Sequence, residues 1–115
     1  MTVNECFTRT CLVGGECTPP TREAFLDVLT RACHAVARLF PERLSFDSLP
    51  TDDGAELPLP PEGAEILPLR VAAEVFYLED AALADRCLSL YAAEAEGIRK
   101  QRKRERETSV VTNGW

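Results

Sequence analysis

Residues 66–98, ILPLRVAAEVFYLEDAALADRCLSLYAAEAEGI, decide the fold that this sequence predicts. Between residues 66 and 78 nearly every side chain is apolar, and only Arg70 and Glu74 interrupt the run. These two residues are four apart, so on a helix they share one face and can form an ion pair. A helix that is apolar around most of its circumference must be covered on most sides. Residues 66–78 are therefore predicted to form the central helix of the core.

A second helix is predicted directly after the central one, from about residue 81 to residue 104. Asp80 is a suitable N-cap, and Asp85 adds negative charge near the positive end of the helix dipole. Two helices joined by so short a turn pack antiparallel or at a corner. The predicted buried face of this helix consists of Leu83, Cys87, Leu90, Tyr91 and Ile98.

A short helix is predicted at the amino-terminal end of the sequence. Thr2 and Glu5 have the spacing of a capping box. Apolar and cysteine side chains then follow at helical spacing, and Gly14-Gly15 provides a stop signal. A β-hairpin through the two glycines is the alternative. The side chains at helical spacing are Val3, Cys6, Phe7 and Cys11.

A longer amphipathic helix is predicted next, with Thr21 as its N-cap, Glu23 in its first turn and Pro41 just beyond its end. Its polar face includes His34, the one histidine of the chain, which has no accompanying acid or serine constellation. We therefore expect His34 to be an exposed helix residue rather than a catalyst. The apolar stripe consists of Phe25, Val28, Leu29, Ala32, Val36 and Leu39, and the opposite face carries Asp27, Arg31, His34 and Arg38.

Residues 41–61, PERLSFDSLPTDDGAELPLPP, are rich in proline and predict an extended loop or a short β-hairpin with a turn at Asp53-Gly54. Leu57 and Leu59 are expected to pack on the helices, and Pro68 is expected in the first turn of the central helix. Ordered loops of this length are usually functional. The acidic residues of this segment do not have the spacing of an EF-hand, so we expect a solvated turn rather than a calcium site.

The composition, 45% hydrophobic and 28% charged over 115 residues, is typical of one soluble globular domain. No run is long enough to span a membrane and no signal peptide is evident, so we expect a cytoplasmic site of synthesis. The five cysteines form an odd set without a C-x-x-C pair, so neither disulfides nor a metal site is expected. Cys17 is predicted to be a loop thiol, and Cys6, Cys11, Cys33 and Cys87 are predicted to be buried.

The charge of the chain is divided unevenly. Residues 1–98 contain 17 acidic and seven basic residues, for a formal charge of −10. Residues 99–107, RKQRKRERE, contain six basic and two acidic residues, for a charge of +4, and the apolar pattern ends at Ile98. A basic end on an acidic body favours head-to-tail contact between subunits or contact with an acidic partner. The alternative is a solvated end of a helix.

The closing residues 108–115, TSVVTNGW, place the one tryptophan of the chain last. Residues 109–112 have β character and Asn113-Gly114 is a turn pair. Because tryptophan is enriched among interface hot spots, we favour an extended intermolecular arm over a tail that folds back on its own core. The predicted interaction residues are Arg99, Lys100, Arg102, Lys103, Arg104, Arg106, Val110, Val111 and Trp115.

These patterns together predict an all-α fold. Residues 1–98 form a small four-helix domain with a proline-rich loop or short β-hairpin between the second and third helices. Residues 99–115 form a basic stalk and an extended C-terminal interaction arm. The sequence has no Gly-rich phosphate loop, nucleophile elbow or metal-ligand spacing. We therefore expect a protein that is not an enzyme and that needs no cofactor.

Residues 57–101, LPLPPEGAEILPLRVAAEVFYLEDAALADRCLSLYAAEAEGIRKQ, and the closing VTNGW resemble the small head–tail adaptor (connector or head-completion) proteins of tailed phages and prophages. The resemblance implies a homo-oligomeric ring of about twelve subunits, bound beneath the portal protein and joined to a tail or tail-terminator (stopper) protein. It also implies that DNA passes through the ring, and that the C-terminal arm reaches a neighbour or the portal. Such a protein is made in the host bacterial cytoplasm and resides in the neck of the virion.

A small nucleic-acid-binding regulator is the second interpretation, with Arg99, Lys100, Arg102, Lys103, Arg104 and Arg106 on phosphates. Three features oppose it. The whole chain has a net charge of −6, Glu105 and Glu107 lie within the basic run, and no helix-turn-helix pattern precedes it. Salt-dependent binding of the isolated protein to duplex DNA would favour this interpretation.

Overall fold

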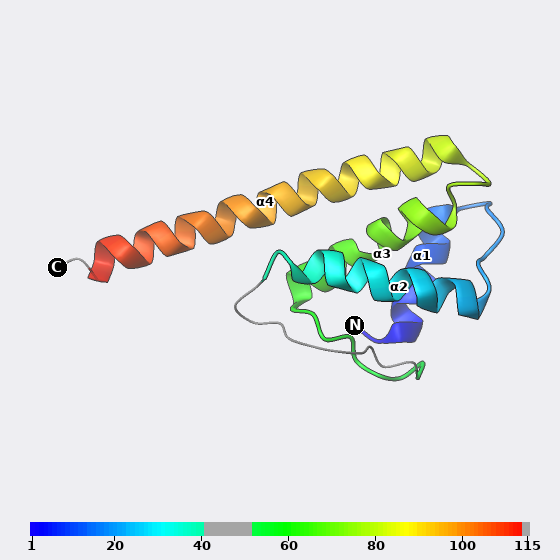
Figure 1. The fold of residues 1–115 in the computed structure, drawn as a ribbon, viewed down its shortest axis with the longest axis horizontal. Helices are drawn as coiled ribbons and strands as arrows, with labels where there is room; N and C mark the ends of the chain where they lie inside the picture. Colours follow the sequence, from blue (N-terminus) through cyan, green and yellow to red (C-terminus); the bar gives the residue numbers. More distant parts are fainter. Residues whose placement is uncertain (41–51, 114–115) are drawn as a thin grey trace.

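The computed structural model describes residues 1–40 and 52–113, with side chains up to Glu107. Within this part of the chain there are four helices and no strands, which confirms the predicted all-α fold (Figure 1). The helices are α1 (Val3–Gly14), α2 (Arg22–Ala37), α3 (Pro61–Val75) and α4 (Ala81–Asn113).

Helix α3 lies at the centre of the fold, and each of the other helices packs mainly against it. Ile66, Leu67 and Val71 are almost completely buried, as the nearly continuous apolar run predicts. Arg70 and Glu74 form the expected ion pair across one turn, with 3.1 Å between Nη1 and Oε1. Helix α4 then returns antiparallel to α3 (Figure 1).

The bounds of α3 differ from the predicted ones. The helix begins at Pro61, five residues early, because the fixed φ of a proline suits the first helical position. Pro68 therefore lies in the helix interior rather than in the first turn, and it has no N–H to donate to the Ala64 carbonyl. The helix ends at Val75, so Tyr77 and Leu78 belong to the exposed α3–α4 turn instead of the central helix.

The predicted caps of the other helices are formed. The Thr2 hydroxyl accepts a hydrogen bond of 3.1 Å from the Glu5 amide, and the Glu5 carboxylate accepts one from the Thr2 amide, which completes the capping box. Thr21 accepts from the Ala24 amide at 3.2 Å. Asp80 accepts from the Leu83 amide at 3.0 Å. Helix α1 extends to Gly14 and ends at Gly15 with a φ of 61°, so the alternative hairpin through these glycines is wrong.

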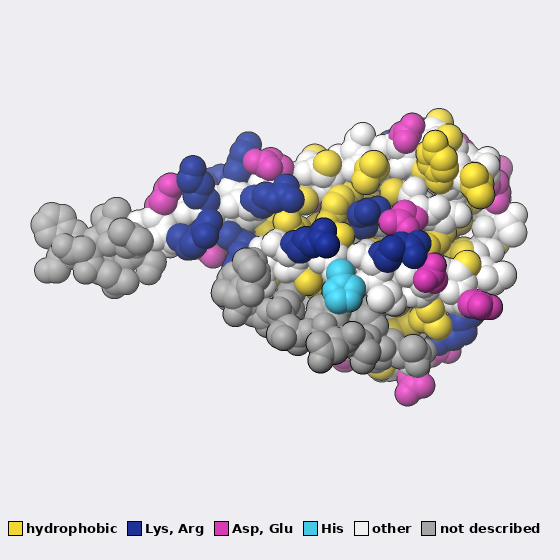
Figure 2. Space-filling view, in the orientation of Figure 1, with side chains coloured by type: hydrophobic (Ala, Val, Ile, Leu, Met, Phe, Trp, Pro, Cys, Tyr) yellow, Lys and Arg dark blue, Asp and Glu magenta, His cyan; other side chains and the backbone are white. Residues whose placement is uncertain are grey.

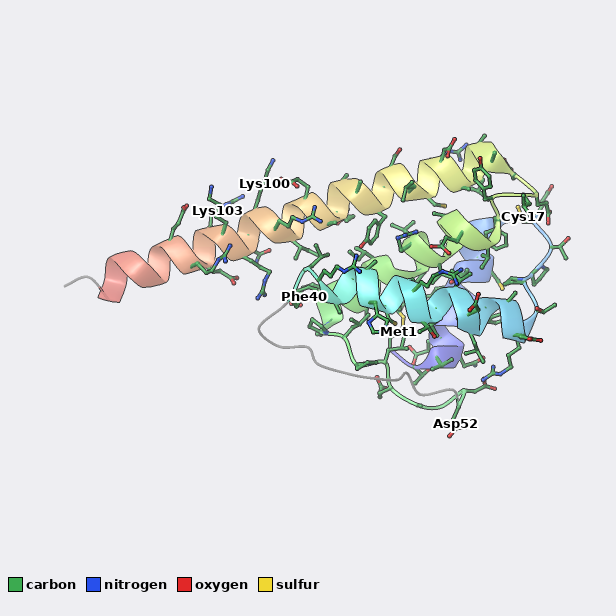
Figure 3. All side chains as sticks on the ribbon, viewed as in Figure 1. Met1, Cys17, Phe40, Asp52, Lys100 and Lys103 are labelled. Carbon is green, nitrogen blue, oxygen red and sulfur yellow. The ribbon has the colours of Figure 1, made fainter. Side chains whose placement is uncertain are left out.

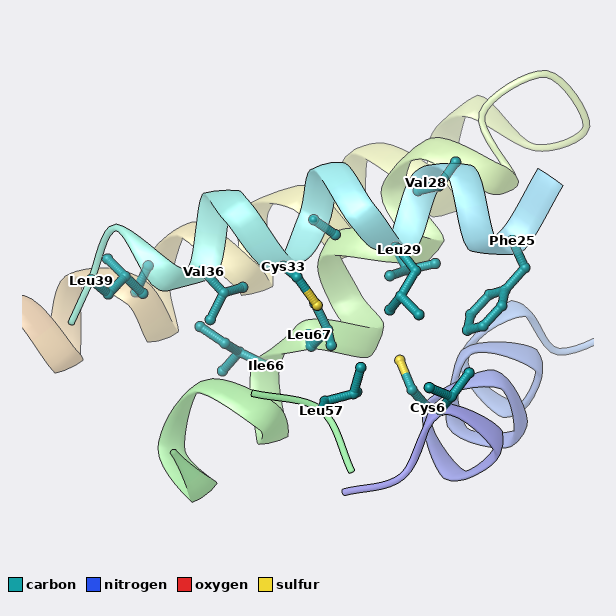
Figure 4. Close-up of a cluster of buried hydrophobic side chains, with 14 of the residues drawn as sticks. Cys6, Phe25, Val28, Leu29, Cys33, Val36, Leu39, Leu57, Ile66 and Leu67 are labelled. Atoms are coloured by element: carbon teal, nitrogen blue, oxygen red, sulfur yellow. The ribbon is translucent and has the colours of Figure 1, made fainter. Parts of the chain in front are cut away.

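The core forms where the apolar stripe of α2 meets α3 and α1 (Figure 4). All six predicted stripe residues are buried, five of them in α2 and Leu39 just beyond its end. Cys6 and Cys33 are buried in the same core, and Cys87 is buried in a smaller cluster with Ala72 and Phe76. Cys17 lies in the α1–α2 loop as predicted, whereas Cys11 is half-buried rather than buried.

The segment before α3 pairs with the amino-terminal residues. The Asp53-Gly54 turn forms as predicted, with a hydrogen bond of 3.0 Å from the Ala55 amide to the Asp52 carbonyl. The Val3 amide donates to the Ala55 carbonyl at 3.0 Å, and the Leu57 amide donates to the Met1 carbonyl at 2.9 Å. Leu57 is buried and Leu59 packs on the core, as expected. The remainder of the predicted loop or hairpin, residues 41–51, lies outside the described residues.

Candidate interaction site

Helix α4 is much longer than the body on which it packs. Its 33 residues span about 50 Å at 1.5 Å per residue. The whole structure measures 57 × 30 × 18 Å, so α4 extends along most of its longest dimension. Figure 1 shows the first part of α4 lying on the other helices and the last part projecting away from them. We refer to residues 99–113 of α4 as the stalk.

The contacts of α4 with the body end at the beginning of the stalk. Ala84, Cys87 and Ala95 are buried, and Tyr91 and Ile98 are half-buried. Arg102 is the last half-buried residue of α4 in the described part, and residues 103–107 are all exposed. The side chains from Lys103 to Glu107 therefore depend on solvent, on each other or on another molecule for their contacts.

The buried face of α4 was predicted only in part. Leu90 was placed on it, but its side chain is 51% exposed. Leu90 lies about 100° around the helix from Tyr91, which faces the body. Ala84 and Ala95, which the sequence reasoning missed, are almost completely buried because small side chains let α4 approach α3 closely. Ala84 is seven residues before Tyr91 and Ala95 is four residues after it, so helical spacing alone would have placed both on the same face as Tyr91.

The carboxyl-terminal end of α4 also differs from its prediction. The helix extends to Asn113 rather than to about residue 104, so residues 109–112 are helical and not extended. The Lys-, Arg-, Gln- and Glu-rich run before them consists of good helix formers, and adding residues to an existing helix costs little. The side chains of Val110 and Val111 and the whole of Trp115 lie outside the described residues.

One cation–π contact fixes the base of the stalk to the body. The Arg102 guanidinium lies over the ring of Phe40, with 5.0 Å between its central carbon and the ring centroid. Phe40 follows the end of α2 and is only 2% exposed, so this contact joins the stalk to a rigid part of the core. Such a contact stabilises by about 0.5–1 kcal/mol at a partly exposed site.

The remaining cations of the stalk form few contacts with their own subunit. Arg99 pairs with Glu96 at 3.6 Å and Lys103 pairs with Glu107 at 4.0 Å, both within the exposed surface of α4. Exposed pairs of this kind contribute little to stability. Lys100, Arg104 and Arg106 have no ion pair with any other residue that the structure describes. Several dark blue side chains lie along the visible face of the stalk in Figure 2, and Figure 3 places Lys100 and Lys103 beyond Phe40.

The thiols of the body are not arranged for nucleophilic chemistry. Burial raises the pKa of Cys6 to about 11 and that of Cys33 to about 12, so both thiols are protonated at neutral pH. Desolvation raises the pKa of Cys17, and the carboxylates of Glu79 and Asp80 raise it further. Among the described residues no three histidine, cysteine or acidic side chains form a group that could hold a metal ion. No helix in this part of the chain is long and apolar enough to cross a membrane.

The functional geometry is therefore a compact body with a projecting, cation-bearing helix. Comparison with protein-family models, curated proteins and solved structures finds no match. The stalk is our candidate interaction site. It carries all six of the basic residues predicted to interact: Arg99, Lys100, Arg102, Lys103, Arg104 and Arg106.

Proposed function

We propose that this protein is a structural assembly subunit, specifically a head–tail adaptor of a tailed phage or prophage that forms a ring between portal and tail. One observation carries the proposal. Helix α4 leaves its own body at Arg102, and the described side chains of the stalk beyond this residue, from Lys103 to Glu107, are all exposed. A helix in water is only marginally stable without tertiary contacts. A partner that covers the stalk would therefore supply the stabilisation that its own subunit does not.

The charges support contact with another protein molecule. The stalk segment 99–107 has a charge of +4, whereas residues 1–98 have a charge of −10. Complementary potentials of this kind guide association and fix the relative orientation of partners. Ring subunits use one surface to bind a different surface on the next subunit, and such heterologous contacts close into a ring when the rotation permits.

The identity of the assembly rests on the resemblance of residues 57–101 and the closing VTNGW to adaptor proteins. On this proposal about twelve copies form the ring, the portal protein lies on one side, and a tail or tail-terminator protein lies on the other. DNA passes through the channel without sequence-specific contacts. The protein is made in the host bacterial cytoplasm and is incorporated into the neck of the virion.

The test is the mass of the full-length protein, alone and mixed with a candidate portal protein, by native mass spectrometry. We expect a ring-sized species in at least one of the two samples. The variant Arg104→Glu/Arg106→Glu should lose it, because both side chains are exposed and neither has an ion pair with another described residue. The control Arg38→Glu/Arg86→Glu changes the net charge equally on exposed residues of the body and should retain the ring. A wild-type protein that stays monomeric in both samples contradicts the proposal.

Nucleic-acid binding is the second candidate, favoured by Lys100, Arg104 and Arg106, which have no ion pair with another residue in the described part of the chain. Fluorescence anisotropy with duplex DNA distinguishes the two functions. A regulator that neutralises several phosphates binds DNA without needing ring assembly, and its affinity falls steeply with salt. For a ring subunit we expect only weak binding, because Glu105 lies between Arg104 and Arg106, Glu107 follows them, and the body is acidic.

A further inference from the structure

The end of the molecule opposite the stalk is built from three segments that meet around Phe76. These are the end of α1, the α1–α2 loop and the α3–α4 turn. Gly14 lies so close to the Phe76 ring that a side-chain carbon on it would overlap the ring. Both carboxylate oxygens of Glu79 accept a hydrogen bond from the Thr18 amide at 3.0 Å. Val13 and Cys17 also pack on the cluster that contains Phe76 and Cys87. The three segments therefore form one fixed surface.

This surface exposes large apolar side chains. Leu78 is 98% exposed, Leu12 is 75% exposed and Tyr77 is 53% exposed. They are three of the five large hydrophobic residues that are exposed in the described part of the chain. Apolar side chains also gather at this end in the view of Figure 2, with acidic side chains beside them. A grouped, exposed apolar surface with polar neighbours is typical of an interaction site.

The charge of the same surface is mainly negative. Glu16, Glu79, Asp80 and Asp85 are all exposed there, and Arg86 is the neighbouring cation on α4. Glu79 and Asp80 also bind backbone amides, whereas Glu16 and Asp85 have no ion pair with another described residue. We define the acidic end as Leu12, Glu16, Tyr77, Leu78, Glu79, Asp80 and Asp85.

The stalk of the same subunit cannot reach the acidic end. Asp80 immediately precedes α4, and Arg104 lies 24 residues further along the same continuous helix. At 1.5 Å per residue the two are about 36 Å apart. Figure 3 accordingly shows Cys17 and Lys103 toward opposite ends of the molecule. Because one rigid helix separates these complementary surfaces, only the stalk of a second copy can meet the acidic end.

We propose that the acidic end binds the stalk of a second copy of this chain, head to tail. This inference rests on the assembly role proposed for the stalk, and it names the surface that receives it. Lys100, Arg104 and Arg106 of one copy would face Glu16 and Asp85 of the next. The aliphatic parts of long basic side chains readily cover apolar surface, here Leu12 and Leu78. Since each copy carries both surfaces, the contact repeats from subunit to subunit.

Mixing two variants tests the proposal. The stalk variant Arg104→Glu/Arg106→Glu keeps an intact acidic end, and the end variant Glu16→Arg/Leu78→Arg keeps an intact stalk. All four residues are exposed, so both variants should fold. In analytical ultracentrifugation at low salt, we expect each variant alone to self-associate at least about tenfold more weakly than the wild type. An equimolar mixture should form a complex of one copy of each variant and stop there, because the other two surfaces are defective. Leu90→Arg, on an exposed residue outside the acidic end, is the control that should assemble normally.

Three results would reject the acidic end as the receiving surface. They are an end variant that assembles like the wild type, a mixture that does not pair, and a wild-type protein that does not self-associate at high micromolar concentration. The first result, together with a defective stalk variant, would leave the proposed assembly function intact and place the contact elsewhere. If the wild-type protein does not self-associate alone but forms a ring on the portal protein, the proposed assembly function is also kept and the contact lies elsewhere. If both variants instead assemble with the portal protein as the wild type does, the stalk itself has no part in the proposed function.

Discussion

At the scale of single residues, Gly14 and Gly97 lie in helices but in opposite surroundings. A side-chain carbon on Gly14 would overlap the ring of Phe76, which is 1% exposed and has little room to move. We expect Gly14→Ala to lower the free energy of unfolding by about 1–3 kcal/mol through overpacking. Apart from its own helix, no described residue has a heavy atom within 4 Å of the same position on Gly97, so Gly97→Ala should raise the free energy of unfolding by about 0.5–1 kcal/mol. Urea unfolding measures both, and stabilisation by Gly14→Ala would contradict the contact.

The buried thiols give the second prediction at this scale. Burial raises the pKa of Cys6 from 9.0 to about 11, so between these pH values the unfolded chain releases a proton that the folded chain retains. Stability is therefore fully present below pH 9 and falls as the pH rises through 11. For each thiol whose pKa is raised from 9.0 to about 11, the free energy of unfolding should be about 1.4 kcal/mol lower at pH 10 than below pH 9.

Urea unfolding at pH 8 and pH 10 checks this expectation. Cys6→Ala should lose less stability between the two pH values than the wild type does, whatever the substitution costs at pH 8. Cys33, whose pKa burial raises to about 12, should behave in the same way. Cys11, which is half-buried, is the control residue and its substitution should change the pH dependence less. An equal loss in the wild type and in Cys6→Ala would contradict the assigned burial.

At the scale of elements, Glu74 connects α3 to α2. It accepts from Arg70 at 3.1 Å and from Arg31 at 3.0 Å, and Arg31 also contacts Asp27 within α2. Arg70 in turn lies 6.0 Å from the ring centroid of Tyr91 on α4. We expect Glu74→Gln to destabilise the protein by about 1 kcal/mol, because Arg70 loses the charge of its partner and Arg31 keeps only Asp27, at a site where Glu74 is only a quarter exposed.

The matched control for Glu74 is Asp27→Asn, which removes an exposed pair within one helix. It should cost only about 0.3–0.5 kcal/mol. Both differences, measured by urea unfolding, should shrink as added salt screens the charges. If Glu74→Gln and Asp27→Asn lower the free energy of unfolding equally, the ion pair between Arg31 of α2 and Glu74 of α3 stabilises the protein no more than an exposed pair does.

The elements that the sequence predicted are those whose signals are local. The caps at Thr2, Thr21 and Asp80 and the apolar stripe of α2 lie within a few residues of the structure they specify. The start of α3 was missed because Pro60-Pro61 is typical of a loop, although Pro61 also suits a first helical position. The pairing of residues 1–3 with residues 55–57 joins segments far apart in the sequence, and no local pattern encodes it.

The candidate site was predictable to a similar degree. The six stalk cations and their separation from an acidic body are visible in the sequence, because charge runs need no tertiary structure to be recognised. The acidic end was not predictable. It requires the end of α1 and the α3–α4 turn to lie at the same end of the molecule, and the contact of Gly14 with Phe76 brings these two segments together. The helical backbone of residues 109–112 depends on continuity with α4, which overrides their preference for strands.

At the scale of the whole molecule, the charges are separated along the long axis, with the stalk at one end and the acidic end at the other. Assembly through these surfaces should therefore weaken with salt, since the screening length falls from about 10 Å at 0.1 M to about 3 Å at 1 M. Sedimentation of the wild-type protein over this range should show progressive dissociation. The stalk variant Arg104→Glu/Arg106→Glu should show a smaller change at every concentration. Association that strengthens with salt would indicate an apolar interface instead.

The last prediction concerns how the stalk is stabilised. Helix α4 has buried side chains against its own body from Ala84 to Ala95, whereas residues 103–107 are all exposed. In a monomer, the amides of residues 103–107 should therefore exchange with solvent faster than those of the packed part of α4. The end variant Glu16→Arg/Leu78→Arg, at a concentration too low for it to self-associate, supplies this state without altering the stalk. In the wild-type assembly the exchange of residues 103–107 should slow at least about tenfold, whereas that of residues 84–95 should not change. Equal protection in monomer and assembly would show that the stalk gains no contacts on association.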